Sequence, residues 1–555
     1  MSYAYVAIAL VCIYAVWVYF SIRSDRKNSL DKIRHDWGRP KSDYFPFHHI
    51  SLYAELQKQK FFHQLSEQTL RDIDFQELFQ FIDRTTTRPG QQYLYNKLIR
   101  PSGNINELET LNSQVKFFTN HTGTRESVQQ DLLALSNSDA YHLSALLRNQ
   151  LLKRPKWLKW LVADTMVVVL LLLLTPFYNV IALFLLIPAT LNMVLHFWNK
   201  GNTDSFTKSF PQLHVLIRLS EKLLQKELPH PKDKVAQAIA ALKPFQSKIK
   251  LLSLGQGGSV KDDLAQIGTY FVDLIKAFLL VEIHVLYHLT KELEDKQHHI
   301  ATLFEYVGNI DLTISVASLR AEGKEVCVPQ FIAPHKKISS KNIYHPLIKK
   351  CVTNTISVHT KSVLITGSNM SGKTTFLRTL IINSVLAQTI CTCFAEAFTT
   401  PILKQFSSIR IDDDLLKGSS YYFEEINIMN SLVKEVNSGH QNLFVSDEVF
   451  KGTNTIERIA SAKAILSYLN KGDNLVFVST HDVELSGMLG SEYDLYHFTE
   501  TIEEDQLHFD HRLKAGPLTT RNAIRLLELS HYPDEITREA NRISSQLTNQ
   551  QQIGL

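Results

Sequence analysis

Three short segments near the C-terminal end combine residue types that could together bind a nucleoside triphosphate and a metal ion. The first has the spacing Gly-x-x-x-x-Gly-Lys-Thr and lies between an apolar run, Ser-Val-Leu-Ile-Thr, and a helical pattern, as a phosphate-binding loop requires. Gly367 and Gly372 allow backbone amides to close around phosphate oxygens, Lys373 is expected to reach the β- and γ-phosphates, and Thr374 is the expected Mg²⁺ ligand. The predicted nucleotide-binding residues of this loop are Gly367, Ser368, Asn369, Met370, Ser371, Gly372, Lys373, Thr374 and Thr375.

The second and third segments are apolar strands that end in ionisable groups. Leu443 to Glu448 ends in two neighbouring acids, of which Asp447 is expected to hold Mg²⁺ and Glu448 to orient or deprotonate the attacking water. The other strand ends at His481, whose imidazole could sense the γ-phosphate or position the water. The alternatives are a solvated strand end for the two acids and a structural role for the histidine.

The elements that must position these residues alternate between short β-branched runs and helical patterns. After Pro329 the predicted strands are Ser-Val-Leu-Ile-Thr, Ser-Ser-Ile-Arg-Ile, Asn-Leu-Phe-Val-Ser-Asp-Glu and Asn-Leu-Val-Phe-Val-Ser-Thr-His. Such alternation predicts a mostly parallel sheet with helices on both faces, in which ligands bind at the carboxyl ends of the strands. Residues 51–151 and 206–320 instead have the apolar spacing of long amphipathic helices.

Two apolar segments predict three membrane spans. Residues 2–22 carry no charge over a length that can cross about 30 Å of hydrocarbon. Basic residues follow this run rather than precede it, which favours a retained anchor over a cleaved signal peptide. The second segment, Trp160 to Trp198, is divided by Thr175 to Asn179 into a helical hairpin with basic flanks on both sides. The alternative for this hairpin is a buried helical pair inside a large soluble core. We expect a bacterial-type cytoplasmic membrane, with the nucleotide-binding domain in the cytoplasm.

Bulk composition restricts the function less than the motifs do. A chain of 555 residues predicts several domains, and a formal net charge of +4 permits contact with nucleic acid or anionic lipid without requiring either. The five cysteines form no paired framework, so we expect reduced and mostly buried thiols.

The three nucleotide segments resemble those of the MutS DNA mismatch-repair family. Thr-Gly-Ser-Asn-Met-Ser-Gly-Lys-Thr-Thr-Phe-Leu-Arg is similar to that family's TGPNMxGKSTxLR, the segment from Leu443 to Thr455 to its LxLLDExGRGTST, and Ser-Thr-His-Asp-Val-Glu-Leu to its ATHYxEL. Gly418 to Glu425 resembles the loop with which one subunit touches its partner's nucleotide, so the resemblance assigns that role to Ser419. The T-x-T-x-x-G spacing of Thr85 to Gly90 resembles the start of the family's helical core.

The resemblance implies ATP and Mg²⁺ as cofactors, a homodimer formed through the ATPase domains, and DNA as a partner. Because the similarity begins near residue 73, we expect no mismatch-reading N-terminal domain. The expected fold is a C-terminal α/β P-loop NTPase domain of the ABC/MutS type, preceded by an all-α helical core or lever domain, with transmembrane helices. The expected divisions are an anchor at 1–24, a linker at 25–72, helical core at 73–156 and 200–328, a membrane hairpin at 157–199, the ATPase domain at 329–545 and a tail at 546–555.

The leading hypothesis is therefore a membrane-anchored ATPase in which ATP hydrolysis drives a dimeric switch that binds DNA, related to mismatch repair or to unusual DNA structures. An ATP-driven membrane switch that acts on a protein without DNA is the first alternative. An ABC-type transporter is the second, although no Leu-Ser-Gly-Gly-Gln-like loop precedes Asp447. An inactive structural protein is a third, and the retained Lys373, Thr374, Asp447 and Glu448 disfavour it.

Overall fold

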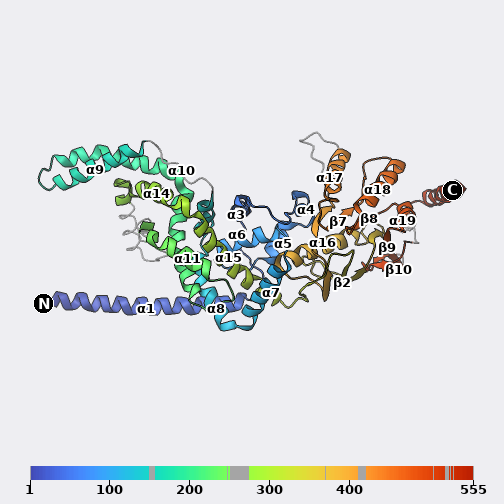
Figure 1. Ribbon diagram of the computed structural model, residues 1–555, viewed down its shortest axis with the longest axis horizontal. Helices are drawn as coiled ribbons and strands as arrows, with labels where there is room; N and C mark the ends of the chain where they lie inside the picture. The colour runs from blue at the N-terminus through green and yellow to red at the C-terminus, as the bar shows by residue number, and fades with distance from the viewer. Residues whose placement is uncertain are drawn as a thin grey trace. The chain divides into compact units, whose positions relative to one another are not determined.

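The computed structural model describes residues 2–553 except 149–156, 247, 250–273, 369, 411–420, 504–505, 519–523, 525–526 and 529–530. Two compact units are present. The first comprises residues 1–60, 79–97 and 110–323, and the second comprises residues 61–78, 98–109 and 324–555. Each unit is described by itself (Figure 1).

The first unit is helical in its described residues. Its longest helices are α1 (Ser2–Asp36), α10 (Ile181–Leu224) and α15 (Gln297–Arg320). α10 packs against α11 and α15 and continues through Pro188 and Pro211. The other helices that lie wholly or partly in this unit are α2 (Phe47–Ile50), α3 (Leu52–Leu56), α5 (Phe75–Ile82), α6 (Arg88–Leu98), α7 (Ile105–Asn120), α8 (Thr122–Leu132), η1 (Leu133–Leu135), η2 (Ser138–Leu147), α9 (Leu158–Leu174), α11 (Asp233–Leu242), η3 (Lys243–Phe245), α14 (Val281–Leu293) and η4 (Glu294–Lys296).

The T-x-T-x-x-G segment is held by a buried aspartate from α15. The carboxylate of Asp311 accepts hydrogen bonds from the backbone N–H groups of Thr86 (2.8 Å) and Thr87 (2.6 Å) and from the Thr87 hydroxyl (2.7 Å). Burial raises the pKa of Asp311 to about 6. A Cβ at Gly90 would lie 2.1 Å from this carboxylate, so only glycine fits there. The motif therefore has threonines where the Asp311 carboxylate needs hydrogen-bond donors and a glycine where it leaves no room for a side chain.

Replacing Asp311 with Ala is expected to lower the free energy of unfolding by about 3 kcal/mol or more, because three donors, two of them buried, lose their acceptor. Urea unfolding of Asp311→Ala and of an exposed control, Asp295→Ala, would measure this effect. Equal midpoints for the two variants would contradict the prediction.

The predicted helical hairpin is present. α9 is followed by a turn and then by the first part of α10, which packs against it (Figure 1). Among the described helices, one segment, Ile181–Trp198, is long and apolar enough to cross a membrane, with a mean hydropathy of 1.9. The three predicted spans are therefore supported at one segment only. α9 has only 17 residues and includes Lys159 and Asp164, and much of the side-chain structure of residues 2–22 lies outside the described residues.

The second unit contains the predicted parallel sheet. Its strand order is β12-β9-β4-β8-β7-β6, and every pairing is parallel except that of β12 with β9. The strands are β4 (Ser362–Thr366), β6 (Lys404–Ser408), β7 (Asn442–Asp447), β8 (Leu475–Thr480), β9 (Tyr493–His497) and β12 (Lys514–Ala515). All residues of β4, β7 and β8 are buried, which explains their unbroken apolar sequences.

Helices cover both faces of this sheet (Figure 1). α16 (Lys373–Ile390) packs against β6, β7 and β8. A separate apolar core joins the sheet to α17 (Tyr421–Glu435), α18 (Thr455–Leu469) and α19 (Val483–Leu489), with Phe444, Leu466 and Val476 among its buried members. The remaining helices that lie wholly or partly in this unit are α4 (Glu67–Asp72) and α21 (Asp534–Ile553) among the described residues, besides the parts of α5, α6 and α7 that fall within it.

Two further sheets were not predicted. One has the order β1-β5-β2-β3, and the other is the hairpin β10-β11. Their strands are β1 (Gln330–Phe331), β2 (Ile338–Ile343), β3 (Asn354–Val358), β5 (Ala397–Thr400), β10 (Glu500–Glu503) and β11 (Gln506–Phe509). One predicted strand was also misplaced: β6 ends at Ser408, whereas the prediction began at Ser407. The buried Gln405 explains the error, because its amide bonds to Ser384 and Gln388 of α16 and so allows a polar residue inside the sheet.

Candidate nucleotide-binding site

The phosphate-binding loop joins β4 to α16. Gly367 and Gly372 have φ angles of 153° and 115°, in the region that favours glycine. A Cβ at Gly367 would lie 2.8 Å from the carbonyl oxygen of Phe498, so the loop also needs glycine there for space. Met370 follows at a φ of 69° and is 82% exposed, whereas Ser371 is buried. Asn369 lies outside the described residues.

Lys373 is the first residue of α16, and its side chain folds back onto the loop. Its Nζ donates hydrogen bonds to the carbonyl oxygens of Gly367 (2.7 Å) and Ser368 (2.8 Å) and lies 3.3 Å from His481 Nε2. Burial lowers the pKa of Lys373 to about 8, although Asp447 and Glu448 favour its charged form. The loop therefore holds one partly desolvated ammonium group at the N-terminus of a helix, an arrangement that attracts phosphate.

Thr374, near the start of α16, contacts Asp447 at the end of β7. The Thr374 hydroxyl donates a hydrogen bond of 2.5 Å to Asp447 Oδ2, and the Ser479 hydroxyl of β8 donates to the other carboxylate oxygen. A hydroxyl and a carboxylate side by side are hard oxygen ligands of the kind that Mg²⁺ prefers. The donor set therefore fits a magnesium ion, for which Thr374 and Asp447 remain the predicted ligands.

Glu448 is the first residue after β7 and has a φ of 57°. Its Oε1 lies 2.7 Å from His481 Nε2, and its Oε2 lies 3.3 Å from Lys451 Nζ. Burial on its own raises the pKa of Glu448, but the hydrogen bond from His481 and the charge of Lys451 outweigh it and lower the pKa to about 2. Glu448 is therefore ionised at neutral pH and is directed by two cationic or donating neighbours.

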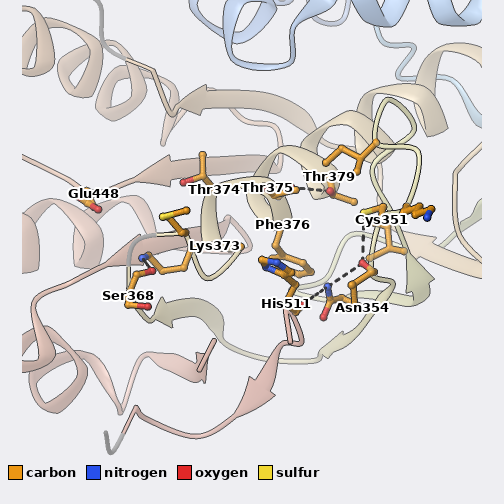
Figure 2. A pocket seen from close by; sticks show the side chains of 16 residues that line it. Cys351, Asn354, Ser368, Lys373, Thr374, Thr375, Phe376, Thr379, Glu448 and His511 are labelled. Atoms are coloured by element: carbon orange, nitrogen blue, oxygen red, sulfur yellow. Dashed lines mark hydrogen bonds between the residues drawn. The ribbon is translucent and has the colours of Figure 1, made fainter. Parts of the chain in front are cut away.

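These residues surround one end of a cavity of 310 Å³. Figure 2 shows Ser368, Lys373, Thr374 and Glu448 toward one side of it, and Phe376, His511, Asn354 and Cys351 toward the other. The cavity lining also includes the apolar side chains of Ile348 and Val352. The volume of the cavity and its mixture of charged and apolar side chains suit a small ligand that has phosphates at one end and a flat ring at the other.

The structure brings together the predicted site residues that it describes, whereas Asn369 and Ser419 lie outside the described residues. Thr375 lines the same cavity, and its carbonyl oxygen accepts a hydrogen bond from the Thr379 hydroxyl. Sequence reasoning missed His511, whose Nδ1 lies 3.0 Å from the Ser371 carbonyl oxygen, and Glu500, which accepts a hydrogen bond of 2.7 Å from Ser368. Neither residue belongs to a local motif, so no pattern in the sequence indicated a role for them.

From the lowered pKa of Lys373 we predict that the affinity for ATP depends on pH. The ammonium loses its proton as the pH rises through about 8, and the neutral amine attracts phosphate poorly. We expect the affinity for ATP to fall more than about tenfold between about pH 7.5 and about pH 9.5. Equilibrium titration with a fluorescent ATP analogue would measure this change. In a Lys373→Arg control, whose guanidinium stays charged, the affinity should be flat over the same range, and a parallel fall would contradict the assignment.

Comparison with known proteins places this site in a family. The family described as MutS domain V matches residues 363–548. The DNA mismatch repair protein MutS of Lactobacillus acidophilus is 29% identical over 282 residues, which are 49% of this chain and 33% of that protein. The MutS proteins of Lactobacillus gasseri and Bacillus thuringiensis strain Al Hakam are 30% and 26% identical over 45% and 53% of this chain. The matched segments span 30% to 34% of these relatives' lengths.

Proposed function

Because the chain is a member of the MutS family through its domain V and its relatives, we propose that it is a Mg²⁺-dependent ATPase. The single observation that carries the proposal is the contact between Thr374 and Asp447, because it joins the end of the phosphate-binding loop to the acidic strand end. Release of phosphate from ATP by the purified full-length chain, with and without Mg²⁺, tests it. No turnover above that of a Lys373→Ala control would contradict it.

The proposed mechanism assigns one task to each residue. Lys373 and the loop amides bind the phosphates, and Thr374 and Asp447 would hold Mg²⁺, which neutralises charge on the phosphate oxygens when bound. Glu448 orients the attacking water. His481, at 2.7 Å from Glu448 Oε1, fixes the direction of that carboxylate. With a pKa of about 2, Glu448 is a weak proton acceptor, so we assign it the positioning and polarisation of water rather than complete proton removal before attack.

We further propose that the ATPase acts as a dimeric switch that binds DNA. The support is the role of the relatives, which are DNA mismatch repair proteins by name, together with the family match. Fluorescence anisotropy with perfect, mismatched and branched duplexes, at several salt concentrations and with or without ATP, tests this proposal. DNA binding predicts an affinity that falls linearly on a log–log plot against salt. No salt-dependent affinity for any duplex would contradict it and would favour the protein-directed alternative.

We also propose that the α9–α10 hairpin inserts into a lipid bilayer. Its large apolar side chains are exposed: Phe177 is 78% exposed, Leu183 67% and Ile187 71%. Only 11% of the Ile181–Trp198 segment is buried. A core helix of a soluble protein would be mostly covered, so exposure on this scale favours lipid as the surrounding medium.

Charged residues on the hairpin are expected to weaken membrane association. The double variant Leu183→Arg/Ile187→Arg places two charges on the exposed apolar face, each at a cost of about 3 kcal/mol if the site lies deep in the bilayer. We expect this variant to move from the membrane pellet to the supernatant after alkaline carbonate extraction, if residues 2–22 do not hold it there. The same experiment on a chain that also lacks residues 2–22 removes this second attachment. Tyr44→Arg, at a position 84% exposed, is the control, and equal pelleting of all forms would contradict hairpin insertion.

A further inference from the structure

Glu425 is a buried carboxylate that no step of the proposed mechanism uses. It lies in α17 and is 0% exposed. Its Oε1 accepts a hydrogen bond from the backbone N–H of Phe450 and one of 3.3 Å from that of Lys451, and Gly452 contributes a further backbone N–H. Burial raises the pKa of Glu425, while these backbone donors oppose the rise. A carboxylate buried at this cost is tied to one turn of the backbone.

That turn carries Glu448. The φ angles of Glu448 and Phe450 are 57° and 64°, a left-handed conformation that costs a residue other than glycine about 1 kcal/mol or more. Two such residues within three positions require restraint from their surroundings. The buried side chains of Val449 and Phe450 supply part of this restraint. The ring of Phe450 packs against that of Tyr422 of α17, with 6.0 Å between the ring centroids. Glu425 supplies the rest by binding the backbone donors on the far side of the turn.

The turn also sets the partners of the Glu448 side chain. Lys451, whose N–H binds Glu425, places its Nζ 3.3 Å from Glu448 Oε2. The backbone N–H of Glu448 itself donates to the Ser479 carbonyl oxygen at 3.0 Å. The strand therefore fixes one end of the turn and Glu425 fixes the other.

We propose that Glu425 is a positioning residue for ATP hydrolysis, which holds the strained turn so that the Glu448 carboxylate faces the attacking water. The inference rests on the proposed ATPase function. By this inference, α17 acts on Glu448, the water-orienting group, through the single carboxylate of Glu425, whose side-chain length sets where the turn is held. An alternative, a buried carboxylate that contributes only to stability, predicts that its loss affects folding and ATP binding as much as turnover.

The length of the side chain separates these possibilities. Glu425→Gln keeps an acceptor oxygen at the same reach without the charge, and Glu425→Asp keeps the charge but withdraws the oxygen by one methylene. Glu425→Ala removes the acceptor, and Glu424→Ala, at the adjacent and partly exposed position, is the matched control. The full-length chain in detergent would be assayed for steady-state phosphate release, for the dissociation constant of a fluorescent ATP analogue and for thermal unfolding.

We expect kcat to fall about 10- to 100-fold in Glu425→Ala and in Glu425→Asp, because a displacement of about 1 Å at a reacting group has effects of this size. Glu425→Gln should recover kcat to within about threefold of the unaltered protein, since its oxygen still accepts the backbone bonds. The dissociation constant for ATP should change less than about threefold in all variants that fold. If Glu425→Ala does not fold, the Gln and Asp pair carries the test.

Three results would overturn the inference. The first is a turnover of Glu425→Asp equal to that of Glu424→Ala. The second is a turnover lost in Glu425→Gln but kept in Glu425→Asp, which would show that the charge of residue 425 matters and its side-chain length does not. The third is an equal loss of ATP affinity and turnover, as a general structural role predicts. If the unaltered chain hydrolyses no ATP, the proposed function fails and this inference with it, whereas turnover that is insensitive to Glu425 overturns the inference alone.

Discussion

A Glu448→Gln protein is expected to bind Mg²⁺-ATP and to hydrolyse it at least about 100-fold more slowly than the unaltered protein. The amide has the size of the carboxylate but carries no charge to polarise the attacking water. It also loses the 2.7 Å contact of the carboxylate with His481 and its 3.3 Å ion pair with Lys451. Because Lys373, Thr374 and Asp447 are unchanged, ATP should stay bound.

Single-turnover hydrolysis and filter retention of radiolabelled ATP measure the two halves of this expectation. Glu424→Gln is the control, since that residue lies outside the site. Unchanged turnover in Glu448→Gln would remove Glu448 from the chemical step and leave only the metal-binding part of the assignment.

A Lys373→Ala protein is expected to lose at least about 100-fold in affinity for ATP, which corresponds to about 3 kcal/mol. The lysine is 4% exposed, and its ammonium bonds to two carbonyl oxygens of the loop that would surround the phosphates. Removing a partly desolvated cation from such a site leaves phosphate charge without its closest counter-charge.

Isothermal titration with ATP in the presence of Mg²⁺ measures this loss, and circular dichroism shows whether the fold persists. Lys451→Ala is the comparison, because Lys451 contacts Glu448 rather than the loop and should lose turnover more than affinity. Tight binding of ATP by Lys373→Ala would show that the phosphates lie elsewhere.

The central part of the nucleotide fold could be predicted from the sequence because its strands are buried on both faces. β4, β7 and β8 are unbroken apolar runs, and each is followed by the polar groups of the site, so the pattern indicated both the strands and their functional edge. The hairpin was predicted for a similar reason, since its two apolar runs meet at a short polar turn.

Contacts between distant segments could not be predicted in this way. Asp72 of α4 accepts hydrogen bonds from the Ser407 hydroxyl (2.6 Å) and the Arg410 N–H (2.8 Å), and so joins residues 61–78 to the end of β6. Nothing near Asp72 in the sequence signals a partner more than 300 residues away. Glu425 and His511 were missed for the same physical reason: their importance lies in backbone groups that any residue provides.

Two uninterrupted helices lead from the predicted membrane segments into the helical unit. α10 runs from Ile181 to Leu224, and its buried apolar side chains resume at Phe206, about 12 Å along the helix axis from Trp198. α1 likewise continues to Asp36, and Arg34 near its end bonds to Glu126 of α8 at 2.8 Å. If the hairpin lies in lipid as proposed, the helical unit is joined to the membrane by continuous helices rather than by a flexible linker. It would then sample only the layer of solution next to the bilayer, and any partner would have to be brought to that surface.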